Sequence, residues 1–130
     1  MAAKRILVVD DEQDSVDFVT AVLAEQDVEV LSARDGEAGL KAAKAQQPDL
    51  IVLDLQMPKK DGLTVLSELR RDQAIRRIPV IILTGIGEKT GVRFSKSDVG
   101  DFMGEEPDAY IEKPISPEVL KSTVRQLLQL

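Results

Sequence analysis

Polar side chains that could do chemistry stand at the ends of four apolar runs in this sequence. In chain order these are Asp10 and Asp11, then Asp54, then Thr84, then Lys113. A carboxylate is costly to bury unless a partner compensates it, so Asp54, directly after an apolar run, needs either a partner or a place at the mouth of a strand. If the runs are neighbouring parallel strands, these side chains converge on one edge of a sheet.

Such a set of groups would suit the transfer of a phosphoryl group. Crowded carboxylates repel one another and raise one another's pKa, and a divalent cation with oxygen ligands relieves that repulsion. A cation and the Lys113 ammonium group could neutralise charge on a phosphoryl group, and a carboxylate can be the nucleophile that forms an acyl phosphate. Asp54 is the candidate nucleophile, because Asp10 and Asp11 are placed to hold the metal. The Thr84 hydroxyl could then bond a phosphate oxygen.

The elements that must position these residues alternate along the chain. Short apolar runs predict strands over residues 5–10, 28–33, 49–55, 78–84 and 108–114. Helical spacing of apolar residues predicts helices over 11–26, 38–45 and 62–72, and a last helix capped by Ser116 with Pro117 in its first turn. This alternation predicts an α/β fold with a parallel sheet covered by helices on both faces.

Composition narrows the possible functions. The 130 residues suit one domain, and the net charge of -6 argues against nucleic acid or anionic lipid as a partner of the surface as a whole. With no Cys and no His, disulfides, thiol or imidazole catalysis and the usual zinc ligands are excluded, so a metal would need oxygen ligands. No run is long enough for a signal peptide or a membrane span, and we expect a cytoplasmic protein with no membrane contact.

Four segments, LVVDDE, VLDLQMPKKDG, IILTG and YIEKP, follow one another in the chain. In order and type they resemble the four signatures of response-regulator receiver domains of two-component signalling, and the resemblance covers essentially the whole chain. It implies a doubly wound five-stranded parallel sheet in the flavodoxin-like order 2-1-3-4-5. It also implies that residues 1–130 form a single, stand-alone receiver domain with no output domain.

The resemblance assigns a role to each polar residue at the edge of the sheet. Asp54 matches the phospho-acceptor, and Asp10 and Asp11 match the acid pair, with Asp11 as the direct Mg²⁺ ligand. Gln56 matches the position that gives its backbone carbonyl to the metal, for which Mn²⁺ could substitute. Lys113 matches the lysine that contacts the phosphoryl group. On this view Asp54 does not lie in the core: it ends a core strand, and Mg²⁺ and Lys113 compensate its charge.

Further positions match the family's switch and turn residues. Thr84 and Tyr110 match the switch hydroxyl and the switch aromatic, although a half-buried core tyrosine fits Tyr110 equally well. Pro58 and Gly62 match the turn after the acceptor, and Pro114 matches the proline that follows the lysine, often through a cis bond.

The resemblance also implies a function and its partners. A phosphoryl group would pass to Asp54 from a phosphohistidine of a sensor histidine kinase or a histidine phosphotransfer protein. The domain would catalyse only its own phosphorylation and dephosphorylation, so it is not expected to be an enzyme acting on another substrate. Thr84 and Tyr110 would then move, and a downstream protein target would read the changed face. We expect a monomer or a weak dimer.

The stretch after Thr84 departs from the family pattern and leaves alternatives open. It is longer than in a typical receiver, and five of the eight glycines lie between Gly85 and Gly104, which predicts an irregular region around the fourth helix. A short helix over about 95–103 is possible. One alternative function is a protein-interaction module that keeps the fold without phosphorylation. A phosphatase with an aspartyl phosphate fits less well, because Gln56 stands where such enzymes carry a second Asp.

Overall fold

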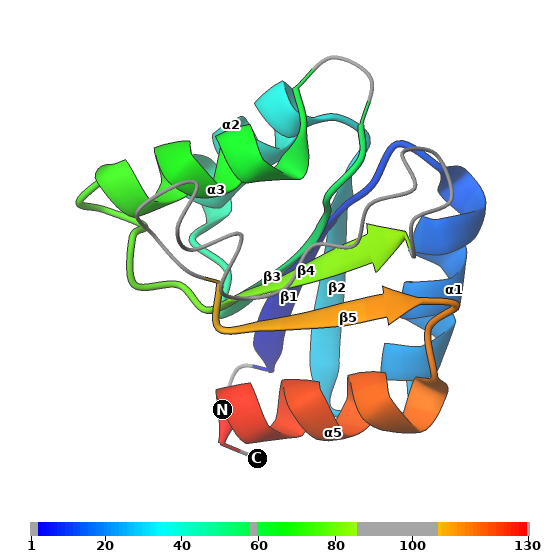
Figure 1. Cartoon of the computed structure of the whole chain (residues 1–130). Helices are drawn as coiled ribbons and strands as arrows, with labels where there is room; N and C mark the ends of the chain where they lie inside the picture. Colours follow the sequence, from blue (N-terminus) through cyan, green and yellow to red (C-terminus); the bar gives the residue numbers. More distant parts are fainter. Residues whose placement is uncertain (1–2, 58–59, 86–106, 130) are drawn as a thin grey trace.

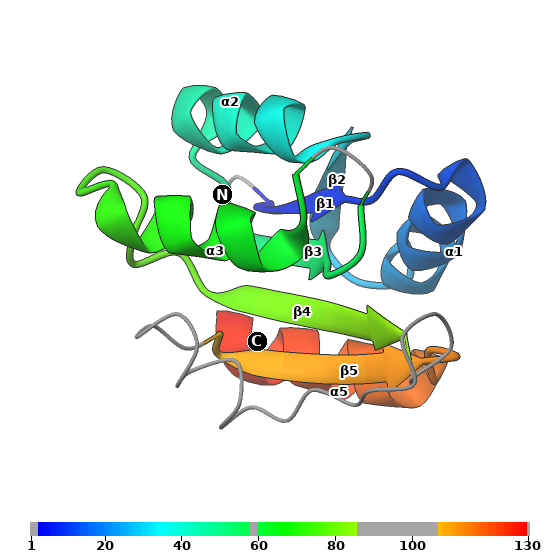
Figure 2. The ribbon, with the colours of Figure 1, turned by 45° about the horizontal axis from the view of Figure 1, so that its top comes forward.

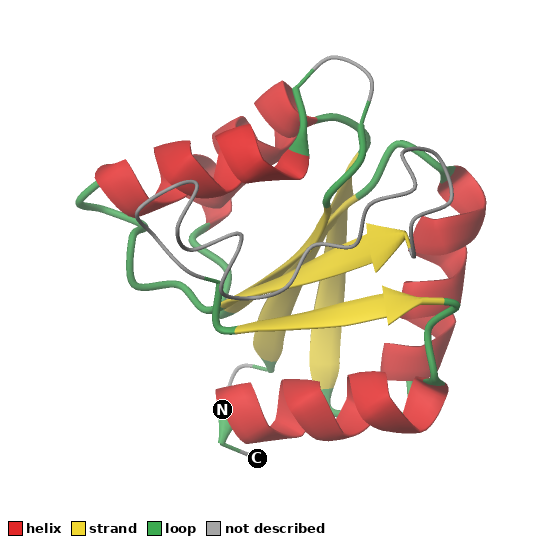
Figure 3. Cartoon of the chain, viewed as in Figure 1, coloured by secondary structure: helices red, strands yellow, loops and turns green. Residues whose placement is uncertain are grey.

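A five-stranded parallel sheet forms the centre of the molecule. The computed structural model describes residues 3–57, 60–85 and 107–129. Within these ranges the strand order is β2-β1-β3-β4-β5, which confirms the predicted order (Figure 1). The strands are β1 (Lys4–Val9), β2 (Val28–Ala33), β3 (Leu50–Asp54), β4 (Val80–Gly85) and β5 (Ala109–Lys113). The helices, red in Figure 3, are α1 (Gln13–Leu23), α2 (Gly36–Gln46), α3 (Gly62–Arg71) and α5 (Pro117–Leu128).

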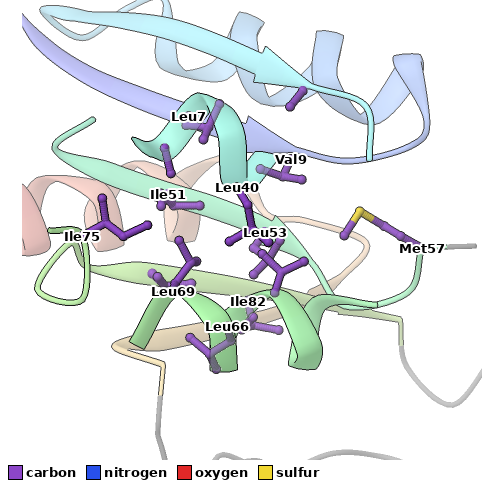
Figure 4. Packing of buried hydrophobic residues seen from close by; sticks show 14 of the residues in the cluster. Leu7, Val9, Leu40, Ile51, Leu53, Met57, Leu66, Leu69, Ile75 and Ile82 are labelled. Atoms are coloured by element: carbon purple, nitrogen blue, oxygen red, sulfur yellow. The ribbon is translucent and has the colours of Figure 1, made fainter. Parts of the chain in front are cut away.

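Helices cover both faces of the sheet, as predicted. Figure 2 shows α2 and α3 on one face and α1 and α5 on the other. The buried side chains form two clusters, because alternate residues of each strand point to opposite faces. In the cluster under α2 and α3, Ile51 and Leu53 of β3 pack with Leu66 and Leu69 of α3 and with Ile82 of β4 (Figure 4). The central strands are buried on both sides, which explains their continuous apolar sequences.

Three helices begin at capping side chains. Asp35, Asp61 and Ser116 each accept a hydrogen bond from the backbone N–H three residues later. These bonds satisfy donors that have no partner within the helix. The predicted cap at Ser116 and the first-turn position of Pro117 are confirmed.

The first helix is shorter than the predicted range 11–26. It spans Gln13–Leu23, and its N-cap residue Glu12 makes no side-chain capping bond. Asp10 turns the chain before the helix begins, because its Oδ1 accepts a hydrogen bond of 3.0 Å from the backbone N–H of Glu12. Asp11 and Glu12 therefore remain in the loop at the carboxyl end of β1.

Some expectations fall outside the described ranges. The short helix considered over 95–103 and the glycine-rich stretch from 86 to 104 lie there. In the described ranges, no helix is long and apolar enough to cross a membrane.

The two-sided core predicts where substitutions cost stability. Leu66→Ala should lower the free energy of unfolding by about 2–5 kcal/mol, because Leu66 is fully buried between α3 and the sheet. Val119→Ala should change it by less than about 0.5 kcal/mol, because Val119 of α5 is 47% exposed. Urea denaturation of both variants checks this pair, and equal losses would contradict the described packing.

Candidate functional site

The carboxyl ends of β1, β3 and β5 bring three charged side chains together. Val8 of β1 is in register with Val52 of β3, so Asp10 and Asp54 follow as the next neighbours on the same face. Lys113 ends β5, in register with Gly85 of β4. Of the five side chains predicted to converge at this edge, the structure thus brings Asp10, Asp54 and Lys113 into contact.

Lys113 forms ion pairs with both carboxylates. Its Nζ lies 3.3 Å from Oδ1 of Asp54 and 3.7 Å from Oδ2 of Asp10. Both acids are buried, with Asp10 0% and Asp54 3% exposed. The expectation that Asp54 lies outside the core is therefore wrong, although its pairing with Lys113 was foreseen. Asp54 is covered because β3 is the central strand and the chain returns over its end, where the Gly62 N–H donates to the Leu55 carbonyl at 2.8 Å.

Burial and mutual repulsion shift the pKa values of this cluster. Burial, together with the nearby charge of Asp10, raises the pKa of Asp54 to about 6, although Lys113 and the Gln56 backbone N–H oppose the shift. Burial also raises the pKa of Asp10 above its usual value. For Lys113, burial acts to lower the pKa, but the charges of Asp54 and Asp10 outweigh it, so its pKa is raised. The lysine is therefore held as a cation.

The acidic loop after β1 has the donors that a hard divalent cation requires. Asp10, Asp11 and Glu12 each offer a carboxylate oxygen, and these atoms lie within 4.8 Å of one another. Among the described residues, Asp10 Oδ2 is a buried side-chain oxygen without a hydrogen bond. An oxygen-only donor set with such an atom fits Mg²⁺. Glu12 was not among the predicted ligands, although its place directly after the acid pair was the available signal.

The predicted switch residues lie on the other face of the sheet. Thr84 is the last residue but one of β4 and is buried. It follows Leu83, which packs in the cluster under α1 and α5, so by strand alternation its side chain points toward α2 and α3. Tyr110 is in register with Ile82 and packs, partly buried, against that α2 and α3 cluster. The structure thus places both residues on one face, and their role as a switch stays a prediction.

Gly62 is required by the close approach of the chain to the backbone of Asp54. A Cβ atom at this position would lie 2.5 Å from the carbonyl oxygen of Asp54 and 2.7 Å from Cα of Leu55. Both are backbone atoms, so no side chain can move away to make room. The Lys113–Pro114 bond is cis. Pro58, the other predicted turn residue, lies outside the described residues.

Comparison with known proteins agrees with this geometry. The family model described as the response regulator receiver domain matches residues 6–125. The chain belongs to this family. Receiver domains generally bind Mg²⁺ at an acidic pocket, which here corresponds to the Asp10–Glu12 loop.

Several curated relatives are response regulators. The receiver domain is 38% identical over 126 residues to the alkaline phosphatase synthesis transcriptional regulatory protein PhoP of Bacillus subtilis, covering 97% of this chain and 49% of that protein. It is 39% identical over 125 residues to the DNA-binding dual master transcriptional regulator RpaA of Synechocystis, covering 96% of this chain and 49% of that one. The chain therefore spans about half the length of these two relatives.

Solved structures share the fold over nearly the whole chain. A putative response regulator from Chloroflexus aurantiacus has a TM-score of 0.84 at 26% identity, covering 98% of this chain and 99% of that one. The receiver domain of a signal transduction histidine kinase from Syntrophus aciditrophicus has a TM-score of 0.82 at 30% identity, covering 98% and 91%. These likenesses confirm the flavodoxin-like receiver fold.

The raised pKa of Asp54 predicts that an uncharged residue at this position stabilises the domain at neutral pH. With a pKa of about 6 in the folded state against 3.8 for the free side chain, the acid is protonated in both states only well below pH 3.8. As the pH rises through 6, ionisation costs the folded state up to about 3 kcal/mol, at 1.36 kcal/mol per pKa unit. Asp54→Asn should therefore be more stable than the wild type at pH 7, and this difference should shrink toward pH 4.

Urea denaturation without divalent cations, from pH 4 to pH 7.5, measures this difference. Asp27→Asn is the matched control, because Asp27 is an exposed carboxylate away from the cluster. A stability difference for Asp54→Asn that does not vary with pH would contradict the assigned shift.

The close packing at Gly62 predicts that even the methyl group of alanine at this position lowers the stability of the domain. Gly62→Ala should destabilise the domain by about 1–3 kcal/mol, the usual cost of overpacking, because its Cβ would overlap the peptide of Asp54. Thermal unfolding measures the loss. Leu63→Ala, one residue later in α3, is the control, because it creates no such overlap. The NMR resonance of the Asp54 backbone amide should shift only in the Gly62 variant.

Proposed function

We propose that this receiver domain is a phosphorylation-activated switch, in which Asp54 accepts a phosphoryl group from a phosphohistidine of a partner protein. The observation that carries the proposal is the contact of the buried Asp54 carboxylate with the Lys113 ammonium group, beside the acidic loop. A buried carboxylate at the carboxyl edge of a parallel sheet lies where such folds bind ligands. Its pKa of about 6 leaves it ionised, and so nucleophilic, at neutral pH.

In the proposed transfer, an oxygen of the Asp54 carboxylate attacks the phosphorus atom. A P–O bond forms and the P–N bond to the partner's imidazole breaks, and the ring nitrogen keeps the electron pair and takes up a proton. Lys113 compensates negative charge on the phosphoryl oxygens. The residues proposed to hold Mg²⁺, or Mn²⁺ in its place, are Asp10, Asp11, Asp54 and the carbonyl of Gln56. When bound, the ion would supply a second cationic group besides Lys113 and would stabilise negative charge on the phosphoryl oxygens.

The proposed response is a change at Thr84 and Tyr110. Thr84 lies near the end of β4, the strand next to β3, and Tyr110 lies on the adjacent edge strand, partly buried. Added charge at Asp54 would draw the Thr84 hydroxyl from the α2 and α3 side of the sheet toward the phosphoryl group, and Tyr110 would turn further inward. Two residues that respond to one local charge make a two-state element that a protein partner can read.

The partners follow from this chemistry. The phosphoryl donor is proposed to be a sensor histidine kinase or a histidine phosphotransfer protein, and the target another protein. The net charge of -6 supports protein partners over nucleic acid for this domain. That the receiver acts as a monomer or weak dimer in the cytoplasm stays a prediction.

The proposal predicts one covalent adduct under defined conditions. Intact mass measured after treatment with acetyl phosphate, or with phosphoramidate as a P–N donor, should show a single added phosphoryl group that requires Mg²⁺. Asp54→Asn should show none, because its amide is not a nucleophile for phosphorus. Asp27→Asn should label like the wild type, because Asp27 is exposed and away from the cluster.

Two results would contradict the proposal in different ways. Equal labelling of Asp54→Asn would place the acceptor at another residue. No adduct in the wild type with either donor would favour the alternative, a protein-interaction module that keeps the receiver fold without its chemistry.

A further inference from the structure

Arg34 connects the end of β2 to the acidic loop after β1. Its Nη2 donates a hydrogen bond of 2.8 Å to the backbone carbonyl oxygen of Asp11, and its Nη1 donates one of 2.5 Å to Oε1 of Gln13. Gln13 in turn donates from Nε2 to Oδ1 of Asp17 at 2.8 Å. One guanidinium group therefore holds the residues on both sides of Glu12 and ties them to the first turn of α1.

The loop is held from β2 at two successive points. The backbone N–H of Asp10 donates to the carbonyl of Ala33 at 3.1 Å, and Arg34, the next residue after Ala33, contacts Asp11. Within the loop, Asp10 accepts from the N–H of Glu12. Because Glu12 makes no capping bond at the start of α1, the geometry of this loop depends on these contacts.

The hydrogen bonds of Arg34 leave the carboxylates of Asp11 and Glu12 available to bind a cation. Arg34 donates to the main-chain carbonyl of Asp11 and to the side-chain amide oxygen of Gln13, so these bonds do not use the carboxylates of Asp11 and Glu12. Those carboxylates belong to the group whose oxygens gather within 4.8 Å. A side chain that holds the backbone of a metal-binding residue also orients the carboxylate of that residue, as hydrogen-bond partners around metal sites commonly do.

We propose that Arg34 is a positioning residue for divalent-cation binding, which it strengthens by holding the Asp10–Glu12 loop in the binding arrangement. The inference rests on the proposed function only in taking this loop as the cation site. A positive charge beside that site has the opposite effect, because it repels a cation. Arg34 is exposed, so salt screens this repulsion strongly. Positioning and repulsion therefore predict changes of opposite sign when Arg34 is removed.

The test is isothermal titration of Mg²⁺ into the unphosphorylated protein at about 0.15 M salt, where the Debye length is about 8 Å. Arg34→Ala should weaken Mg²⁺ binding about three- to tenfold, at or below the low end of the effects known for residues that orient metal ligands, because Arg34 is exposed. Arg34→Lys keeps a charge and a donor of similar reach, and it should recover most of the affinity. Asp11→Ala should abolish the binding and so identify the site.

Arg5→Ala is the matched control. Arg5 makes the same kind of contact, from Nη2 to the backbone carbonyl of Gln46, at the opposite end of the strands. Its loss should lower the unfolding midpoint measured without Mg²⁺ and leave the Mg²⁺ affinity unchanged. A residue with a merely structural role would behave in this way.

Several outcomes would overturn the inference. Arg34→Ala could bind Mg²⁺ as tightly as the wild type or more tightly, which would leave repulsion as its only effect. Arg5→Ala could weaken binding equally, which would make the effect one of general stability. If the wild type did not bind Mg²⁺, or if Asp11→Ala bound it unchanged, the Asp10–Glu12 loop would not be the cation site. Because the titration needs no phosphoryl transfer, its result is independent of whether Asp54 is an acceptor.

Discussion

The ammonium group of Lys113 faces two buried carboxylates, and the arrangement of the site depends on this contact. Removing one partner of a buried ion pair typically costs about 3–5 kcal/mol, because a charge is then left without compensation. Here the compensation is incomplete even when the lysine is present. Asp10 and Asp54 both lie within 4 Å of its Nζ, and the pKa values of both acids stay raised. The fold therefore holds unfavourable negative charge at one defined place.

The rest of the fold makes that place rigid. β1 and β3 are neighbouring parallel strands whose register carries Asp10 and Asp54 to the same edge and the same face. Two apolar clusters lock these strands from both sides, so the carboxylates cannot separate without disturbing the core. Gly62 completes the enclosure by bringing the chain back over the Asp54 peptide. Buried like charges lower stability, and a core that nevertheless holds them together is typical of functional sites.

Much of this architecture follows from the sequence, because apolar runs and the polar residues that end them are local signals. The capping at Ser116 and the meeting of Asp10, Asp54 and Lys113 were predicted on that basis. The strand order was predicted from the resemblance to receiver domains. The burial of Asp54 was not, since it depends on the distance between the end of β3 and the start of α3. The contact of Arg34 with Asp11 also escaped prediction, because an arginine in a loop gives the same local signal whether it is solvated or bonded.

Counting formal charges explains why the proposed site needs both a lysine and a divalent cation. Asp10, Asp54 and Lys113, all ionised, carry one net negative charge. A phosphoryl group would change the charge at Asp54 from one negative to about two, which would leave the three residues with about two net negative charges in a buried place. A divalent cation brings the sum over these three residues to about zero, whereas a second lysine would leave it negative. The carboxylate of Asp11, which is proposed to hold the cation, adds a further negative charge and makes the need for the cation greater. The charge balance therefore favours Asp54 as a phosphoryl acceptor only when the acidic loop holds its cation, so the two proposed functions of this edge are coupled by electrostatics.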